Sequence, residues 1–326
     1  MSFKAFRRLP LASVVVTTAA LLAACGGGSQ VTAFAPTRVL AFGDETSVIE
    51  DASNNGNGRK YTVNALAADN VTLNCAGNPI WVQYLATQYG LTFPQCNPGA
   101  VAAPASRIRA AAGAKVADVK AQIDAQLAAD GFNGLDLVTI LAGSNDILAQ
   151  YAQYPGVPEA TLVATLEQAG IDLAAQVNRV ALAGGKVLIA TVPDLGLTPF
   201  AVTESADPAK DSGRAALLTR LTARLNAKLR LNIINDGRKI GLLLADETFQ
   251  TLVKFPTGYG LVNLTQPACT SAAVRDCTTL TLQPAVGSAA AATAASWLWA
   301  SPLQPGATGH SQLGQLAASR ARGNPF

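Results

Sequence analysis

The chain has 326 residues, which is enough for one large α/β domain or two small ones. Hydrophobic residues make up 49% and charged residues 14% of it, which excludes a disordered chain and a charge-rich coiled coil. Three of the 24 basic residues lie near the N-terminus, so the remaining 21 balance the 21 acidic residues. A nucleic-acid partner is therefore not expected, because phosphate binding needs a basic surface.

The N-terminal segment has the pattern of a bacterial export signal. Lys4, Arg7 and Arg8 precede an uncharged run over 9–24, which ends at Cys25. As a helix this run would rise about 24 Å, less than the roughly 30 Å of hydrocarbon in a bilayer. The tetrapeptide 22–25, Leu-Ala-Ala-Cys, resembles the lipobox at which bacterial lipoproteins are cleaved and acylated.

That resemblance implies a signal peptide over 1–24, a lipidated Cys25 that begins a flexible tether over 25–35, and a single domain over 36–326. The protein is then exported and lipid-anchored, in the periplasm or at the outer membrane, and it contacts a membrane through its anchor. The alternative is a plain signal peptide cleaved near Ala24, which would leave Cys25 as an odd thiol.

The other cysteines are even in number, as expected of an exported chain. Three pairings are possible, and local pairing is the simplest of them. Neither spacing is Cys-x-x-Cys and the chain has a single histidine, so zinc is not expected. Local pairing predicts two disulfides, Cys75–Cys96 and Cys269–Cys277.

Short apolar runs alternate with longer helical patterns, which predicts an α/β fold with a parallel sheet covered by crossover helices. The runs lack clean alternation, as expected where both faces of a sheet are buried. Strands are predicted over 38–42, 135–142, 186–192 and 240–245. Helices are predicted over 79–89, 116–129, 158–182, 208–235 and 308–322, with Pro208 in a first turn and Gly184–Gly185 as a stop.

Polar motifs follow these strands, where the chemistry of a doubly wound sheet collects. Together they resemble the SGNH/GDSL hydrolases, a family of esterases, lipases and thioesterases with a flavodoxin-like three-layer α/β/α fold. The similar segments are Phe42-Gly43-Asp44, Gly143-Ser144-Asn145-Asp146, 81–86, 193–199, 259–263 with Cys269, and 304–310.

The family attacks an ester with a serine, activated by a histidine that an aspartate orients. The resemblance places Glu45 at the nucleophile position, Ser301 at the aspartate position and Gln304 at the histidine position. Asn145 keeps the oxyanion position of the family. At the family's other oxyanion motif a glycine is expected, but Gly99 lies early in the similar segment, and Ala103 and Pro104 stand near the glycine position. Gln cannot take a proton from a hydroxyl, so the resemblance implies an impaired ester hydrolase.

The sequence leaves several alternatives open for the roles of individual residues. Ser47 and His310 could replace the missing nucleophile and base, or His310 could simply pack on the last helix. Asp44, Glu45 and Asp146 could hold a divalent cation, or the two aspartates could stabilise their turns. Trp297 and Trp299 could flank a ligand pocket or pack in the core.

The sequence therefore predicts a substituted SGNH/GDSL-like lipoprotein that binds an acyl or glycan ligand or a partner protein. The first alternative is an active ester hydrolase that uses Ser47 and His310. The second is a structural envelope lipoprotein. We expect no cofactor and no metal, and the sequence identifies no protein partner.

Overall fold

A computed structural model describes residues 33–285 and 291–326. Residues Phe34–Phe326 form one compact unit. The expected signal peptide, Cys25 and most of the tether lie outside the described residues. No helix in the described ranges combines the length and the apolarity needed to cross a bilayer.

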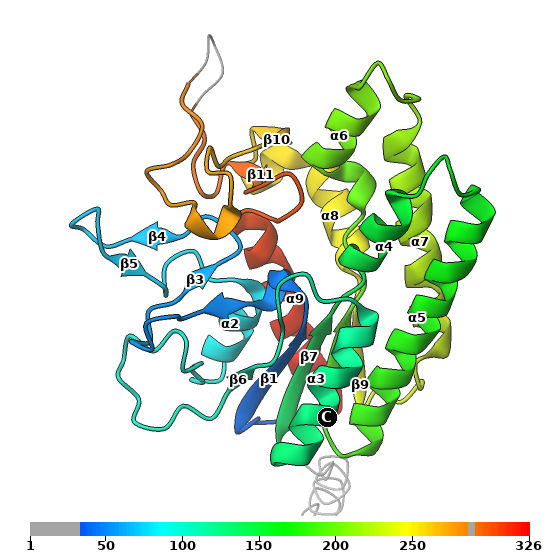
Figure 1. Cartoon of the computed structure of the whole chain (residues 1–326). Coiled ribbons are helices and arrows are strands. Elements are labelled where there is room, and N and C mark those ends of the chain that lie inside the picture. The colour runs from blue at the N-terminus through cyan, green and yellow to red at the C-terminus, as the bar shows by residue number, and fades with distance from the viewer. Residues whose placement is uncertain (1–32, 286–290) are drawn as a thin grey trace, which may run out of the picture. The chain divides into compact units, whose positions relative to one another are not determined.

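The centre of the unit is a parallel five-stranded sheet in the order β6-β1-β7-β8-β9 (Figure 1). Numbered along the chain, these strands have the spatial order 2-1-3-4-5 of flavodoxin-like folds. The first and third lie side by side, with Leu40 of β1 opposite Val138 of β7. The sheet strands are β1 (Arg38–Gly43), β6 (Arg107–Ile108), β7 (Asp136–Leu141), β8 (Lys186–Ala190) and β9 (Ile240–Leu243).

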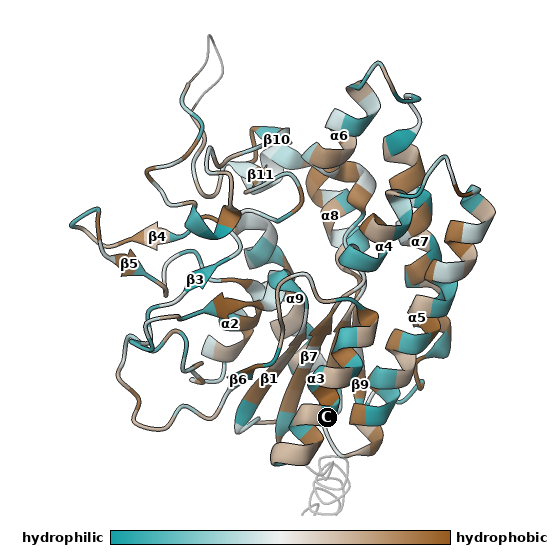
Figure 2. Cartoon of the chain, in the orientation of Figure 1, coloured by the Kyte–Doolittle hydropathy of each residue, from teal (hydrophilic) through white to brown (hydrophobic). Residues whose placement is uncertain are grey.

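Helices cover both faces of this sheet, which makes three layers. Val39 and Ala41 of β1 face α2 and α9, while Leu40 and Phe42 face α3, α5 and α7. Figure 2 shows hydrophobic strands beneath helices that mix hydrophobic and hydrophilic residues. The helices are α2 (Trp81–Thr87), α3 (Val116–Ala129), α4 (Ser144–Tyr151), α5 (Glu159–Leu182), α6 (Pro199–Ala206), α7 (Arg214–Asn232), α8 (Ala245–Lys254) and α9 (Ala307–Gly323).

Three short two-stranded sheets lie outside the five-stranded sheet. They pair β2 (Ile49–Glu50) with β3 (Arg59–Lys60), β4 (Ala65–Leu66) with β5 (Leu73–Asn74), and β10 (Asn263–Pro267) with β11 (Trp297–Trp299). Trp297 and Trp299 are buried in apolar clusters, so both belong to the core.

Both predicted disulfides are confirmed, with Cα–Cα distances of 5.7 Å for Cys75–Cys96 and for Cys269–Cys277. The helix predicted over 208–235 is present as α7, but its predicted start at Pro208 is wrong, and α6 was not predicted. Helix α6 ends at Ala206 and α7 begins at Arg214, with Pro208 in the turn between them. Proline disfavours a helical conformation in the residue before it, here Asp207, which is extended. Gly184, with φ of +108°, follows α5 as predicted.

Candidate functional site

The polar motifs meet where β1 and β7 end, two strands that are neighbours in the sheet although they are first and third along the chain. In open α/β sheets this reversal of strand order opens a crevice at the carboxyl ends of the strands. Glu45 follows β1, and Asn145 lies in the first turn of α4 after β7. The loop that carries Ser301 and Gln304 comes from β11, far along the chain, to the same place.

Gly43 allows the close approach of these two strands. Its φ is +123°, and a Cβ there would lie 1.8 Å from the carbonyl oxygen of Leu141. The next residue, Asp44, caps the short helix Glu45–Ser47 by accepting a hydrogen bond from the Thr46 amide at 3.1 Å. Burial raises the pKa of the Asp44 carboxyl well above its usual range, and the adjacent charge of Glu45 adds to this. Asp44 is therefore a turn residue that positions Glu45.

The Glu45 carboxylate accepts hydrogen bonds from three donors. Its Oε2 lies 2.9 Å from the Gly113 amide nitrogen and 3.1 Å from Asn145 Nδ2. Its Oε1 lies 3.2 Å from Gln304 Nε2. The carboxylate thus occupies the amide donors that would polarise the carbonyl oxygen of a bound ester.

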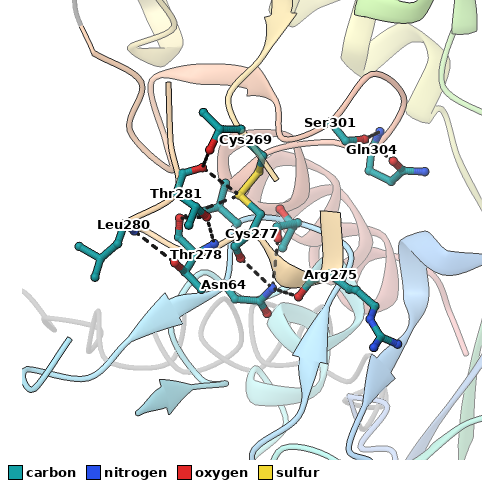
Figure 3. Close-up of a disulfide and its surroundings, with 12 residues drawn as sticks. Asn64, Cys269, Arg275, Cys277, Thr278, Leu280, Thr281, Ser301 and Gln304 are labelled. Atoms are coloured by element: carbon teal, nitrogen blue, oxygen red, sulfur yellow. Dashed lines mark hydrogen bonds between the residues drawn. A yellow bond between two sulfur atoms is a disulfide. The ribbon is translucent and has the colours of Figure 1, made fainter. Parts of the chain in front are cut away.

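Ser301 and Gln304 are hydrogen-bonded to each other, as Figure 3 shows. The Ser301 hydroxyl donates a hydrogen bond to the side-chain Oε1 of Gln304, and it accepts one from the backbone amide of Gln304 at 2.9 Å. A continuous row therefore runs from Ser301 through Gln304 to Glu45, in the order that the resemblance assigns to acid, base and nucleophile. Neither the Ser301 hydroxyl nor the Gln304 carboxamide is basic enough to take up a proton at neutral pH, so neither can act as a general base.

The loop with Ser301 and Gln304 is fixed from three sides. The Cys269 amide donates to Ala300 O at 2.9 Å, so the segment closed by the Cys269–Cys277 disulfide supports the loop (Figure 3). Thr62 Oγ1 donates to Pro305 O at 2.9 Å, and the Phe200 amide donates to Pro302 O at 3.0 Å.

Gly113 is a site residue that the sequence interpretation missed. The expected oxyanion glycine lay near Gly99–Pro104, but Ala103 is exposed and Ser106 accepts a hydrogen bond from Val39 N, beside the sheet. The strand β6 has only two residues and shows no apolar run, so the loop that follows it could not be located from the pattern. The structure gives Gly113 a φ of +75°, which favours glycine, but nothing in the sequence distinguishes it from the other glycines of this loop region.

Asp146 turns away from Glu45. Its Oδ2 accepts a hydrogen bond from the Val116 amide at 3.0 Å, at the start of α3. Burial raises the pKa of this carboxyl. In the described ranges, no three His, Cys, Asp or Glu side chains are grouped as a metal site would require. Asp44 thus stabilises its own turn, whereas the Asp146 carboxylate holds the first amide of α3 instead of its own turn.

Ser47 and His310 lie beneath this surface, on either side of Trp81. Ser47 is fully buried and its Oγ accepts a hydrogen bond from Trp81 Nε1 at 3.1 Å. His310 is 1% exposed, and its Nδ1 accepts from the Trp81 amide at 3.4 Å. Burial lowers the pKa of His310 to about 3, and the charge of Lys60 adds to this. No hydrogen bond between Ser47 and His310 is present in the described chain.

A cavity of about 600 Å³ opens beside the Gln304 loop. It shares Leu303 with that loop and runs along α4, the helix that carries Asn145. Its lining combines aromatic rings with charged groups, as small-molecule sites do. The aromatic and charged lining residues are Tyr151, Tyr154, Phe200, Glu204, Lys210 and Arg214.

Comparisons with known proteins identify one matching family. The model of the family described as GDSL-like Lipase/Acylhydrolase matches residues 39–282. No curated protein matches the chain closely enough to count as a relative.

Among solved structures, the acetylxylan esterase Axe2 from Geobacillus stearothermophilus is 14% identical, with a TM-score of 0.44, over 89% of this chain and 96% of that one. A member of the lipolytic protein G-D-S-L family from Veillonella parvula is 12% identical, with a TM-score of 0.39, over 86% of this chain and 95% of that one. These likenesses are distant.

Proposed function

Because the chain belongs to the GDSL-like lipase/acylhydrolase family, we propose that it is an exported lipoprotein whose inherited ester site binds an acyl or glycan ligand without hydrolysing it. One observation carries this proposal. The carboxylate of Glu45, at the nucleophile position, holds the amide donors of Gly113, Asn145 and Gln304.

The chemistry of the three substituted positions argues against turnover. A carboxylate that attacked an ester would form a mixed anhydride, and water would then have to be activated to release it. Gln304 is the neighbouring side chain at the base position, and an amide takes no proton from water. The negative charge of Glu45 also opposes a developing oxyanion at the same donors, because like charges at hydrogen-bond distance repel.

The surroundings of the site still suit a ligand. The adjoining cavity of about 600 Å³ has the volume of a small-molecule site. The ring of Phe200 offers apolar surface for an acyl chain or a sugar face. Lys210 donates to Glu204 at 2.6 Å, and a further N–H of its ammonium can reach a hydroxyl or carboxylate.

Thermal unfolding of the purified mature protein with a panel of acetylated oligosaccharides and short-chain acyl glycosides tests the proposal. A ligand at a hundredfold excess over its Kd adds about 2.7 kcal/mol to the free energy of unfolding, which raises Tm by several degrees. The shift should be lost in Phe200→Ala and kept in Gln168→Ala, an exposed position on α5. Release of acetate would contradict the proposal, and no shift with any compound would favour a purely structural role.

A further inference from the structure

The edge of the sheet opposite the candidate site carries exposed apolar side chains. It is formed by the loops that lead into β7, β8 and β9, here called the basal edge (131–135, 182–186 and 231–239), at the lower end of Figure 1. Four large apolar residues on it are exposed, namely Leu135 (50%), Leu182 (69%), Leu231 (78%) and Ile234 (37%). Exposed apolar residues occur elsewhere too, but this edge has three further properties.

First, hydrogen bonds join the loops of the basal edge to one another. Asn178 of α5 holds the end of α7, since its Nδ2 donates to Asn232 O at 2.9 Å and its Oδ1 accepts from the Ile234 amide at 2.8 Å. Lys186 Nζ donates to Arg238 O at 2.8 Å, which joins the loop before β8 to the loop before β9. The apolar side chains are thus presented by backbone that is tied together.

Second, the free charges of this edge are basic. Neither Lys186 nor Lys239 forms an ion pair in the described chain, and Arg238, although paired with Asp236, has a largely exposed side chain. The acidic groups are paired, because Arg38 binds both Asp136 and Asp130 and Arg238 binds Asp236 at 3.2 Å. Apolar side chains with basic neighbours are typical of surfaces that rest on anionic lipid.

Third, the chain enters the domain here. The ring of Phe34 packs against that of Phe326 with centroids 5.5 Å apart, and the Thr37 amide donates to Leu135 O at 3.0 Å. Only nine peptide steps separate Cys25 from Phe34, so even a fully extended segment spans roughly 30 Å. A lipid on Cys25 would keep this edge within that distance of the bilayer.

We propose that the basal edge is a membrane-docking surface that seats Leu182, Leu231 and their basic neighbours on an anionic bilayer. The inference rests on the proposed lipidation of Cys25. It deepens the proposed function, because the strands' carboxyl ends and Glu45 then point away from the bilayer. The ligand must therefore be presented from the aqueous side, which favours a glycan over a lipid of the anchoring membrane.

A site-specific fluorophore tests this orientation. The described cysteines are in disulfides and Cys25 is acylated in this proposal, so an introduced cysteine is the only free thiol. Leu231→Cys reports the basal edge, and Val71→Cys is the control, because Val71 is 81% exposed and lies beside β5, away from that edge. Each lipidated protein is labelled with an environment-sensitive probe and reconstituted on phosphatidylglycerol–phosphatidylethanolamine vesicles.

At position 231 we expect blue-shifted emission and quenching by a lipid-borne quencher, and at position 71 neither effect. Vesicle-bound protein with the same response at both positions would overturn the docking surface and leave the lipid anchor intact. Protein that does not bind vesicles at all would overturn the anchor and, with it, this inference.

Discussion

His310 provides a sharp test of the buried region beneath the site, because it is the only histidine in the chain. Burial lowers its pKa to about 3, whereas a histidine in the unfolded chain titrates near 6.5. Protonation would also turn Nδ1 from an acceptor into a donor that faces the Trp81 amide. The folded protein therefore holds His310 neutral.

The size of the effect follows from linkage. Between about pH 6.5 and 3 the unfolded state binds one more proton than the folded state, so stability falls as the pH falls. Between pH 7 and pH 5 this amounts to about 2 kcal/mol from His310 alone. In His310→Asn the amide oxygen replaces the acceptor for the Trp81 amide, and the variant should lose this part of the pH dependence.

Denaturant unfolding of the wild type and His310→Asn at pH 7 and pH 5 measures the difference, and the titrating acids common to both proteins cancel. The single histidine resonance in a proton NMR titration of the wild type gives an independent reading. We expect no titration of this resonance between pH 8 and 5. A midpoint near 6.5, or equal pH dependence in both proteins, would refute the reasoning and make His310 available as a base.

Three further predictions concern stability and anchoring. Lys60 is fully buried, and its Nζ donates to the backbone carbonyls of residues 75, 77 and 78. In denaturant unfolding, Lys60→Met should therefore lower the free energy of unfolding by about 3 kcal/mol. The control Lys120→Met, at an exposed position, should lower it by less than about 0.5 kcal/mol. Replacing Cys269 and Cys277 with serine should cost about 2–3 kcal/mol in the same assay, and an unchanged midpoint would argue against the bond. Cys25→Ala should abolish lipid labelling and membrane fractionation, and retention of both would disprove the anchor.

The strands and the loops after them could be predicted because buried parallel strands have a strong apolar signal. The runs that end at Phe42 and Ala142 placed Glu45 and Asn145 at the ends of neighbouring strands, and the structure brings these residues together. Gln304, which lies 259 positions from Glu45, could be assigned only from the resemblance, since nothing local to its sequence indicates that contact.

Other features leave no such signal in the sequence. Gly113 follows a strand of two residues, too short for an apolar period, so the more conspicuous Gly99 was chosen in its place. The direction of the hydrogen bonds at Glu45 depends on the rotamers of two amide side chains and on one backbone amide, which no pattern of residue types specifies. The start of α7 lies at Arg214 and not at Pro208, because a proline fits the turn before a helix as well as a first helical turn.

We propose that the site keeps the arrangement of an ester hydrolase and lacks only its reactive groups. The combined change Glu45→Ser, Ser301→Asp and Gln304→His places a nucleophile, a base and a carboxylate along the existing hydrogen-bonded row. Removing the Glu45 carboxylate also frees Gly113 N and Asn145 Nδ2 for an oxyanion.

The direct measurement is the kcat/KM for p-nitrophenyl acetate of the parent protein and of this triple variant, with Glu45→Ser alone as the control that lacks a base. We predict no enzymatic turnover by the parent and a gain of at least about a hundredfold in the triple variant, because one oxyanion donor alone is worth that much in rate. Robust turnover by the parent, or a folded triple variant with no gain, would contradict the account.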